Sequence, residues 1–330
     1  MKILVAGLGR IGRHIIRELC DTKAEIEFDI YDLNQDLANH IYLLNYDSIY
    51  GLRSQRFKLS SKSIIDTLSK KEICFVDMQS RNFDFSVYDY VIDSTGSLDF
   101  LENAKKTAKR VYITNSLKNS IVDKYSISNV GENKANNNDK VVSLSICDTT
   151  AIAPILVSLE NEFKIIQGHI TTLHPWLNYQ NLSDNGVEST EVKSTYIGDY
   201  SLGRKTTENL IPKNTSAVSA MSFVFPEISK KITSWSFRVP TPIVSTALLN
   251  IQLGSETDKD QIIDLFSAKS FIDIGNENLI SSDYVGVKKS CVIDAASIKV
   301  LNKTVFFNLW YDNELGYVSQ ILNLIDELEA

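Results

Sequence analysis

The sequence predicts an α/β fold with two domains, a doubly wound parallel sheet followed by an α+β domain whose sheet is mainly antiparallel. A G-x-G-x-x-G turn at residues 7–12 lies between an apolar segment and a helical pattern. Apolar segments then alternate with helical patterns up to about residue 147. Beyond residue 164, strand-like segments follow one another with few helices between them, which indicates an antiparallel sheet.

The composition limits the possible classes of protein. With 330 residues, 43% of them hydrophobic, the chain is long enough for two domains with cores of their own. A net charge of −7 argues against nucleic acid or an anionic membrane surface as a partner. No apolar run is long enough to span a membrane, and the four cysteines show no C-x-x-C spacing. We expect a cytoplasmic protein without a disulfide framework or a metal site.

The N-terminal turn has the pattern of a Rossmann-type dinucleotide site. After the apolar segment 2–6, Gly7 permits the tight turn, Gly9 lets the backbone approach a pyrophosphate, and Gly12 allows close helix–strand packing. The diphosphate would lie on the helix N-terminus. The expected contacts from this turn include those of Gly7, Gly9, Arg10, Ile11 and Gly12.

A second strand-like segment, 26–31, ends at Asp32, twenty residues after Gly12. A carboxylate at this point suits the two hydroxyls of a ribose and repels a 2′-phosphate. The sequence therefore predicts NAD as the cofactor, in preference to NADP.

The remaining elements of the first half continue the alternation. We predict strands at 90–93, 110–114 and 141–147, and helices at 35–45, 98–108 and 119–126. Thr95, Gly96 and Thr114 follow the carboxyl ends of strands, where such sheets bind ligands.

The second half begins with a helical pattern over 151–163, in which Pro154 is tolerable only within the first turn. We predict strands at 165–174, 232–239, 243–252, 290–298 and 304–311. The long polar segment 175–208 has no periodicity, which is typical of functional or disordered loops. The expected domains are 1–147, joined by a C-terminal helix over 314–330, and 148–313.

Cys147 lies between a strand pattern and a helical pattern. Free backbone N–H groups and the positive end of a helix favour the thiolate, which is the nucleophilic form of cysteine. A buried, inert cysteine is the alternative.

The choice of a base for Cys147 is narrow, because the chain has four histidines. His14 and His40 lie in helical patterns and are expected to be packed or solvated. His169 and His174 share one strand and, five residues apart, face opposite sides of the sheet. His174, at the carboxyl end of the strand, is the better candidate.

Seven motifs occur in order along the chain. They are Gly7–Arg13, Tyr46-Asp47-Ser48 with Gly51, Ser94-Thr95-Gly96, Asn209–Pro212, Phe237–Thr241, Ser281–Asp283 and Trp310–Tyr317. In these motifs the chain resembles the phosphorylating glyceraldehyde-3-phosphate dehydrogenases over nearly its whole length.

The resemblance implies a reaction and a set of residues. Cys147 would attack an aldehyde, His174 would act as general base, and hydride transfer to NAD would leave a thioester. Asn313 would orient the nicotinamide carboxamide, and Asp32 would hold the adenosine ribose. Further cofactor residues would be Thr95, Gly96, Thr114 and Tyr317. The substrate and anion residues would be Asp148, Thr149, Arg204, Thr215, Ser216 and Arg238. The loop 175–208 would pack across a subunit interface of a homotetramer.

The chain departs from the family pattern around the nucleophile. Where the family reads Ser-Cys-Thr-Thr-Asn, Ile146 and Asp148 replace two hydroxyl residues that hold inorganic phosphate, and Ser216 replaces a glycine. Leu177 and Tyr179 stand where the family carries two threonines that bind the substrate's phosphate. A carboxylate at position 148 would oppose phosphate binding, because two negative charges about 4 Å apart repel by about 4 kcal/mol at an effective dielectric constant of 20.

Three functions remain open from the sequence. The first is NAD-dependent oxidation of glyceraldehyde 3-phosphate or a related aldehyde. The second is a non-phosphorylating, erythrose-4-phosphate dehydrogenase-like enzyme, whose thioester passes to water or another acceptor. The third is an NAD-binding regulatory protein without catalysis.

Overall fold

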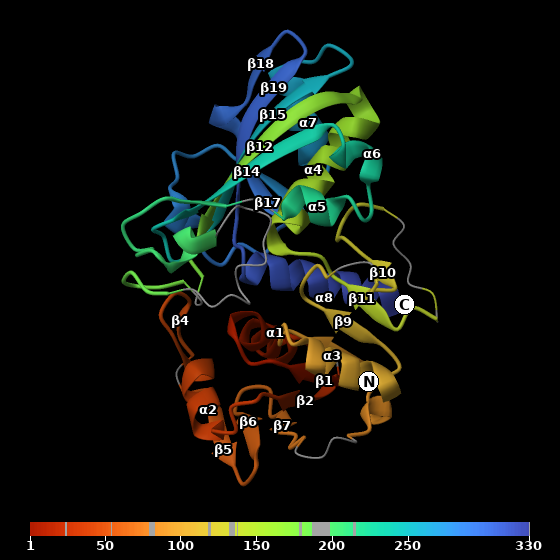
Figure 1. The fold of residues 1–330 in the computed structure, drawn as a ribbon, viewed down its shortest axis with the longest axis vertical. Coiled ribbons are helices and arrows are strands. Elements are labelled where there is room, and N and C mark those ends of the chain that lie inside the picture. The colour runs from red at the N-terminus through yellow and green to blue at the C-terminus, as the bar shows by residue number, and fades with distance from the viewer. Residues whose placement is uncertain are drawn as a thin grey trace. The chain divides into compact units, whose positions relative to one another are not determined.

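The computed structural model describes residues 1–23, 25–53, 55–78, 83–117, 120–131, 136, 138–177, 180–186, 199–213 and 216–329. The chain divides into two compact units (Figure 1). Unit 1 consists of Met1–Ile146 with Ile321–Ala330, and unit 2 is Cys147–Gln320. The C-terminal helix α8 (Leu315–Glu329) contributes residues to both units.

Unit 1 is built on a parallel six-stranded sheet, as expected from the alternating pattern. The strand order is β10 (Lys124–Tyr125), β11 (Val141–Ser143), β9 (Val111–Ile113), β8 (Tyr90–Asp93), β1 (Lys2–Ala6) and β2 (Glu27–Tyr31). The order reverses between β1 and β8, so the loops that follow these two strands lie side by side at the point where doubly wound sheets bind ligands.

The helices of unit 1 follow the predicted ones closely. They are α1 (Arg10–Asp21), α2 (Leu37–Asn45) and α3 (Leu98–Thr107). The buried face of α3 carries Leu101 and Ala104, which pack with Leu4, Val91 and Val111 of the sheet. Burial of such side chains is the main stabilising term of this layer.

Two predictions in unit 1 are wrong. The strand expected at 141–147 ends at Ser143, because Ser145 adopts a positive φ of 62° and a helix begins at Cys147. No helix lies over residues 120–126, the described part of the helix expected at 119–126. There the chain forms β10 instead, since the Asp123 carboxylate accepts the N–H groups of Lys140 and Val141 and aligns the chain with β11.

Residues 46–87 carry small elements that the sequence pattern does not reveal. They are β3 (Tyr46–Asp47), β4 (Gly51–Leu52), β5 (Phe57–Ser60), β6 (Ser63–Asp66), β7 (Glu72–Cys74) and the 3-10 helix η1 (Phe85–Val87). Strands β5, β6 and β7 form an antiparallel sheet of their own. Strands of two to four residues are too short to show the alternation from which a strand is predicted.

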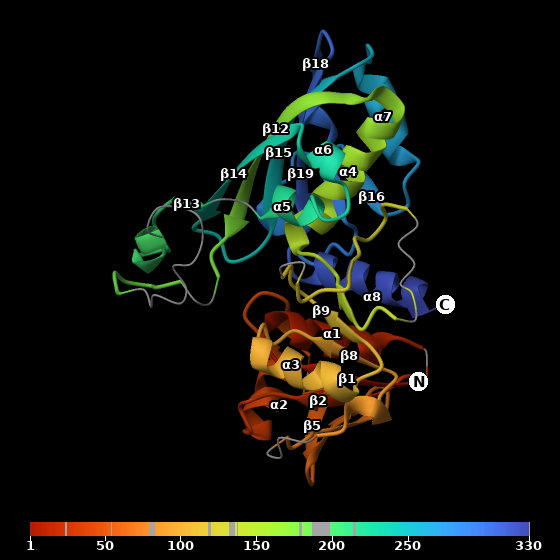
Figure 2. The same ribbon diagram turned by 45° about the vertical axis from the view of Figure 1, so that its right-hand side comes forward.

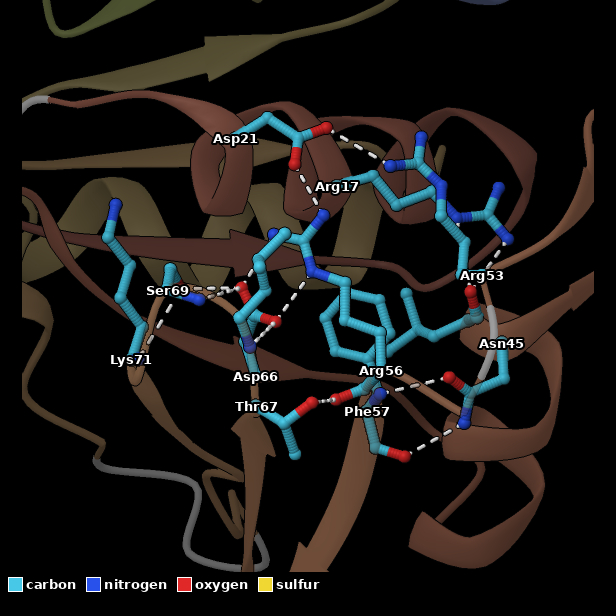
Figure 3. A network of polar contacts seen from close by, with 12 residues as sticks. Arg17, Asp21, Asn45, Arg53, Arg56, Phe57, Asp66, Thr67, Ser69 and Lys71 are labelled. Carbon is cyan, nitrogen blue, oxygen red and sulfur yellow. Dashed lines mark hydrogen bonds and ion pairs between the residues drawn. The ribbon is translucent and has the colours of Figure 1, made fainter.

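A polar network attaches this small sheet to the helices of unit 1 (Figure 3). Arg56 donates Nε to Asp66 Oδ1 at 2.5 Å and Nη2 to Asp66 Oδ2 at 2.6 Å, and its Nη1 bonds Asp21 at the end of α1. The Asn45 side chain exchanges two hydrogen bonds with the backbone of Phe57. The Asp66 side chain is fully buried, so the bidentate pairing with Arg56 supplies its charge compensation.

Unit 2 contains the second predicted sheet, which is mixed and mainly antiparallel. Its strands run in the order β13 (Ile211–Lys213), β14 (Ile232–Val239), β12 (Ile165–Pro175), β15 (Ser245–Leu253), β19 (Thr304–Tyr311), β17 (Cys291–Asp294) and β16 (Ile272–Gly275), with β18 (Lys299–Leu301) beside β19. Only the pairs β12–β14 and β16–β17 are parallel among the described strands of this sheet. The segment expected as one strand over 290–298 is β17 followed by the 3-10 helix η4 (Ala295–Ser297).

Helices cover one face of this sheet (Figures 1 and 2). The helix α4 (Cys147–Phe163) packs on β12 and β15, and α5 (Ala217–Met221) and α6 (Pro226–Ser229) pack beside it on β14. The unit also contains α7 (Lys259–Ser267) and the 3-10 helices η2 (Asp199–Gly203) and η3 (Ser281–Tyr284).

Helix α4 begins four residues before the predicted start at residue 151. The earlier start places Cys147, Asp148 and Thr149 in its first turn. The prediction that Pro154 lies in that turn is therefore wrong: Pro154 is inside the helix, where it cannot donate to the carbonyl group of residue 150. No helix of the described part of the chain has the length and apolarity needed to cross a membrane.

Candidate active site

The first residue of α4 is Cys147, directly after the turn that leaves β11. The side chain keeps part of its surface exposed, while Asp148 and Thr149 beside it are buried. The N–H groups of a helix's first turn have no partners within the helix, and they point toward a group bound there. The position thus presents a sulfur atom beside several hydrogen-bond donors.

His174 lies near the end of β12, with Nε2 3.6 Å from the Cys147 Sγ atom. On the other side of the ring, Nδ1 is 2.8 Å from the carbonyl oxygen of Pro175. A carbonyl oxygen can only accept, so Nδ1 carries the proton and the lone pair of Nε2 faces the sulfur. His169 is partly exposed and contacts Thr233 and Thr171, as expected for the opposite face of the strand.

Asp148 places a carboxylate oxygen beside both of these side chains. Its Oδ1 atom lies 3.6 Å from Cys147 Sγ and 3.8 Å from His174 Nε2. The hydroxyl of Tyr311, at the end of β19, donates to the same oxygen at 2.8 Å. A sulfur, an imidazole nitrogen and a carboxylate oxygen therefore form a compact triangle, which we call the Cys147 triangle.

Burial shifts the pKa values of Cys147 and His174. It raises the pKa of the Cys147 thiol well above the ordinary value; Asp148 adds to the rise, and Arg238 opposes it. Burial also lowers the pKa of His174 to about 4, with Arg238 in the same direction and Asp148 against it. Both shifts favour the thiol and the neutral imidazole over an ion pair. Burial and the adjacent carboxylate thus oppose the thiolate that the sequence predicts.

Arg238, on β14, is a predicted anion-binding residue whose charge acts on both Cys147 and His174. Its side chain is buried, and Nη1 donates to the Pro175 carbonyl oxygen at 3.4 Å. The Nε atom has no hydrogen-bond partner among the described residues. A buried donor in this condition costs free energy unless a ligand or water satisfies it. Arg238 therefore meets the requirement for a residue that binds an anionic group.

The other described residues predicted to bind an anion are either exposed or already hydrogen-bonded within the protein. Arg204 is largely exposed, and its Nε pairs with Asp184 at 3.0 Å. The hydroxyl of Thr149 donates to the Ala217 carbonyl oxygen at 3.1 Å and is committed to the α4–α5 contact. Ser216 is exposed and precedes the short helix α5. Thr215 and Tyr179 lie outside the described residues.

The glycine turn of unit 1 has the packing that a dinucleotide site requires. Gly7 adopts a φ of +85°, and a Cβ atom there would lie 2.7 Å from the backbone of Ser94. A Cβ atom on Gly12 would lie 1.8 Å from the Gly7 carbonyl oxygen. At Gly9, by contrast, no heavy atom of the described residues lies within 4 Å of such a Cβ. The first and third glycines are thus required by packing, whereas the second leaves open backbone, which fits a pyrophosphate.

Side chains predicted for the cofactor gather around this turn. The Asp32 carboxylate accepts the Leu8 N–H at 2.6 Å, so it lies beside the glycine turn. Thr95 donates its N–H and hydroxyl to the Asp93 carboxylate, and Gly96 has a φ of +68°. The Thr114 N–H donates to the Asp93 carbonyl oxygen at 3.1 Å. These residues share the edge of the sheet at which β1 and β8 end, and they fit an NAD molecule.

The four other residues predicted to bind the cofactor lie outside this group, two on α1 and two in unit 2. The Arg10 guanidinium pairs with Asp47 at 3.1 Å, and Ile11 is partly exposed on α1. In unit 2, Asn313 is buried and its Oδ1 atom has no partner among the described residues, which fits an amide that binds a carboxamide. Burial raises the pKa of Tyr317 well above its ordinary value, and Cys147 adds to the rise.

The sequence pattern does not indicate the part played by Tyr311. The residue lies within the motif Trp310–Tyr317, but a tyrosine near a strand end is ordinarily read as a packing residue. Its hydrogen bond to Asp148 spans 163 positions in the chain. Strand parity offers one signal, because Tyr311 falls on the same buried face of β19 as Leu309 and Phe307.

Comparison with protein families gives two matches. The model described as "Glyceraldehyde 3-phosphate dehydrogenase, C-terminal domain" matches residues 146–313. The model described as "Glyceraldehyde 3-phosphate dehydrogenase, NAD binding domain" matches residues 1–100. Together the matches include the glycine turn, the Cys147 triangle and Asn313.

Individual relatives are similar over their full lengths. The glyceraldehyde-3-phosphate dehydrogenase of Glossina morsitans morsitans is 30% identical, over 100% of this chain and 98% of its own. The enzyme of the same name from Chlamydia trachomatis is 29% identical, over 100% of this chain and 99% of its own. Glyceraldehyde-3-phosphate dehydrogenase 2 of Saccharomyces cerevisiae is 29% identical, over 99% of both chains.

Proposed function

We propose that this chain, which belongs to the glyceraldehyde-3-phosphate dehydrogenase family, oxidises a phosphorylated aldehyde with NAD through a thioester on Cys147. The observation that carries the proposal is the separation of 3.6 Å between Cys147 Sγ and His174 Nε2. A nucleophile and its base must lie within such a distance for proton transfer to accompany attack.

The proposed reaction begins from the neutral pair. As Sγ attacks the aldehyde carbon, the thiol proton passes to Nε2 of His174, and a thiohemiacetal forms on Cys147. The backbone N–H groups at the start of α4 stabilise the oxygen that gains negative charge. The Asp148 carboxylate, 3.8 Å from Nε2, stabilises the imidazolium as it forms, although it opposes ionisation of the thiol alone.

The residues that would bind NAD include those of the glycine turn and Asn313. In unit 1, the backbone at Gly9 would approach the pyrophosphate, and Asp32 would accept the ribose hydroxyls. The Asn313 amide oxygen, which has no partner in the described part of the chain, would bind the carboxamide. When bound, NAD accepts the hydride from the thiohemiacetal carbon and so leaves a thioester on Cys147.

Arg238 supports a phosphorylated substrate. Its guanidinium is buried, and its Nε, which no described residue pairs with, can donate to a phosphate oxygen. The family resemblance assigns the same kind of role to Arg204, although the exposed side chain pairs with Asp184 in the structure.

The residues beside the nucleophile favour water as a second candidate for the acyl acceptor. The Asp148 carboxylate lies 3.6 Å from Sγ and would repel inorganic phosphate. The hydroxyl of Thr149 donates its proton to the Ala217 carbonyl oxygen and so does not donate to a phosphate. Asp148 could instead take a proton from a water molecule that attacks the thioester, which yields a carboxylic acid and regenerates the thiol.

Family membership supports a quaternary state and a location for the chain. We propose a cytoplasmic homotetramer, in which the segment 175–208 contributes to a subunit interface. Light scattering coupled to size-exclusion chromatography measures the mass directly. A monomer at micromolar concentration would contradict this part of the proposal.

The function is tested by NADH formation with a panel of aldehydes, which includes glyceraldehyde 3-phosphate, erythrose 4-phosphate and their unphosphorylated counterparts. Each is assayed with and without phosphate. We expect NADH with at least one phosphorylated aldehyde. Turnover that strictly requires phosphate or arsenate rejects water as the acceptor. No NADH with any member of the panel rejects the proposed function.

A further inference from the structure

We propose that the Cys147 triangle is a binding site for Zn²⁺, with Cys147 Sγ, Asp148 Oδ1 and His174 Nε2 as its three protein ligands. The spacing of the three ligand atoms supports metal binding, which does not depend on the aldehyde chemistry. Its consequence, reversible block of the nucleophile, rests on the proposed function.

The spacing of the three atoms fits one small cation. The edges of the triangle are 3.6 Å between Sγ and Oδ1, 3.6 Å between Sγ and Nε2, and 3.8 Å between Nε2 and Oδ1. Zn²⁺ binds sulfur at about 2.3 Å and nitrogen or oxygen at about 2.0 Å in a tetrahedron, which separates the ligand atoms by about 3.3–3.6 Å. The two edges to sulfur already have this length, and the third needs to shorten by about half an ångström.

The donor set favours Zn²⁺ over Mg²⁺ and Ca²⁺. A thiolate, an imidazole and a carboxylate are all established zinc ligands, and three protein ligands leave a fourth position for water. Mg²⁺ and Ca²⁺ require six or more oxygen ligands, which the Cys147 triangle does not provide. The thiolate and the carboxylate together carry two negative charges, which balance the charge of the metal in a buried place.

The surroundings orient the ligands as a metal requires. The His174 Nδ1–H donates to the Pro175 carbonyl oxygen at 2.8 Å, which leaves Nε2 as the free acceptor. The Tyr311 hydroxyl holds the Asp148 carboxylate at 2.8 Å. Arg238 is the opposing charge, and its Nη1 is directed to the Pro175 carbonyl oxygen instead of the triangle. The site therefore has two of its three ligands fixed before any metal arrives.

The inference departs from the sequence-based expectation of no metal site, which followed from the absence of C-x-x-C spacing. Two of the ligands are neighbours at the start of α4, and the third is brought from β12 by the fold. Binding forms a Zn–S bond and releases the thiol proton to solvent. No oxidation or reduction is involved, so chelation reverses it.

The test uses the full chain after treatment with EDTA, titrated with Zn²⁺ in competition with a chromophoric chelator. We expect one zinc ion per chain, and at least tenfold weaker binding in each of the variants Cys147→Ser, Asp148→Thr and His174→Ala. Circular dichroism checks that each variant is folded. Asp264→Asn, which removes an exposed carboxylate of α7, is the matched control and should bind zinc as the wild type does.

Co²⁺ serves as a spectroscopic probe of the same site. Thiolate-to-cobalt charge-transfer absorption should appear in the wild type and disappear in Cys147→Ser. The inference is overturned if the zinc stoichiometry and affinity are the same in the wild type and all three ligand variants, which would indicate adventitious surface binding only.

Activity separates this inference from the proposed function. We expect Zn²⁺ to inhibit NADH formation and EDTA to restore it. Zinc binding that needs the three residues, in a protein that oxidises no aldehyde, supports the metal site and rejects the proposed function. Aldehyde oxidation by a protein that does not bind zinc supports the proposed function and rejects the metal site.

Discussion

The Tyr311 hydroxyl donates a hydrogen bond of 2.8 Å to Asp148 Oδ1, and this bond joins the end of β19 to the start of α4. Burial raises the pKa of Tyr311 well above its ordinary value, and the Asp148 carboxylate adds to the rise. The phenol is therefore a permanent donor, and Asp148 is held beside Cys147 in one orientation.

Tyr311→Phe removes the hydroxyl, and with it the bond to Asp148, while the ring remains. We expect the variant to lose about 1.5–3 kcal/mol of stability, the contribution typical of a hydrogen bond to a charged group. Urea unfolding followed by circular dichroism measures the loss. Tyr42→Phe, at an exposed position of α2, is the control and should not change the unfolding midpoint. Equal midpoints for both variants would show that the Tyr311 bond contributes nothing.

Asp148→Asn should make Cys147 more reactive. Burial and then Asp148 raise the thiol pKa, so removal of the carboxylate's charge lowers it and increases the thiolate fraction at pH 7. We expect alkylation by the uncharged reagent iodoacetamide to accelerate by roughly threefold or more. Peptide mass spectrometry locates the label on Cys147. The control Asp264→Asn has the same change of charge at an exposed site and should react at the wild-type rate.

The pH dependence of Cys147 alkylation tests the pKa of the thiol. Since the pKa of the Cys147 thiol lies well above its ordinary value, the thiolate is the minor form at neutral pH. Alkylation of the wild type should therefore rise about tenfold per pH unit from pH 6 to 9. A rate that is constant over this range would mean a low-pKa thiolate and would contradict the assigned protonation states.

The glycine turn offers a matched pair of variants. Gly12→Ala places a Cβ atom 1.8 Å from the Gly7 carbonyl oxygen, so it should strongly destabilise unit 1. Gly9→Ala places a Cβ atom in open space, so the fold should survive while NAD binding weakens. Thermal unfolding and titration calorimetry with NAD separate the two effects. If Gly9→Ala binds NAD as tightly as the wild type, the pyrophosphate does not approach Gly9.

Asp66→Asn tests the network of Figure 3. Burial alone would raise the pKa of Asp66, but hydrogen bonds from Arg56, Ser69 and the Leu68 N–H lower it below the ordinary value. The carboxylate therefore stabilises the fold above the unfolded pKa of about 4, and this contribution is lost as the pH falls through the folded pKa. Replacement of one partner of a buried pair should cost about 3–5 kcal/mol at pH 7.

The difference in stability between wild type and Asp66→Asn should accordingly shrink below about pH 4. Urea unfolding over a series of pH values measures it. Asp184→Asn removes the acid of the exposed pair with Arg204 and should change stability little at any pH. A difference that does not vary with pH would exclude the Asp66 carboxylate as its source.

The sequence pattern predicts the parts of the fold that depend on local chemistry. The glycine turn, the alternation of strands and helices, and a cysteine and a histidine at element ends are all visible in consecutive residues. The start of α4 is less predictable, because Pro154 suggests a helix that begins near residue 151. The turn at Ser145, with its positive φ, permits the earlier start.

The electrostatics of the site depend on tertiary structure. Cys147 at a helix N-terminus predicts a thiolate, but the depth of burial, which raises the thiol pKa, appears only after the sheet and α4 pack together. Likewise, Asp148 meets His174 and Tyr311 across separations of 26 and 163 residues, which no periodicity reveals. Short strands such as β5 and β7 are missed for the opposite reason, since three or four residues carry too little pattern.

The thioester on Cys147 is tested most directly by intact-mass analysis of the enzyme after mixing with NAD and a phosphorylated aldehyde. Phosphate is left out, and NADH formation is followed in the same mixture. We expect a burst of one NADH per chain and an acyl adduct on the Cys147 peptide, both absent in Cys147→Ser. The thioester mechanism is contradicted if Cys147→Ser forms NADH as the wild type does, or if the wild type binds NAD but gives neither NADH nor an adduct.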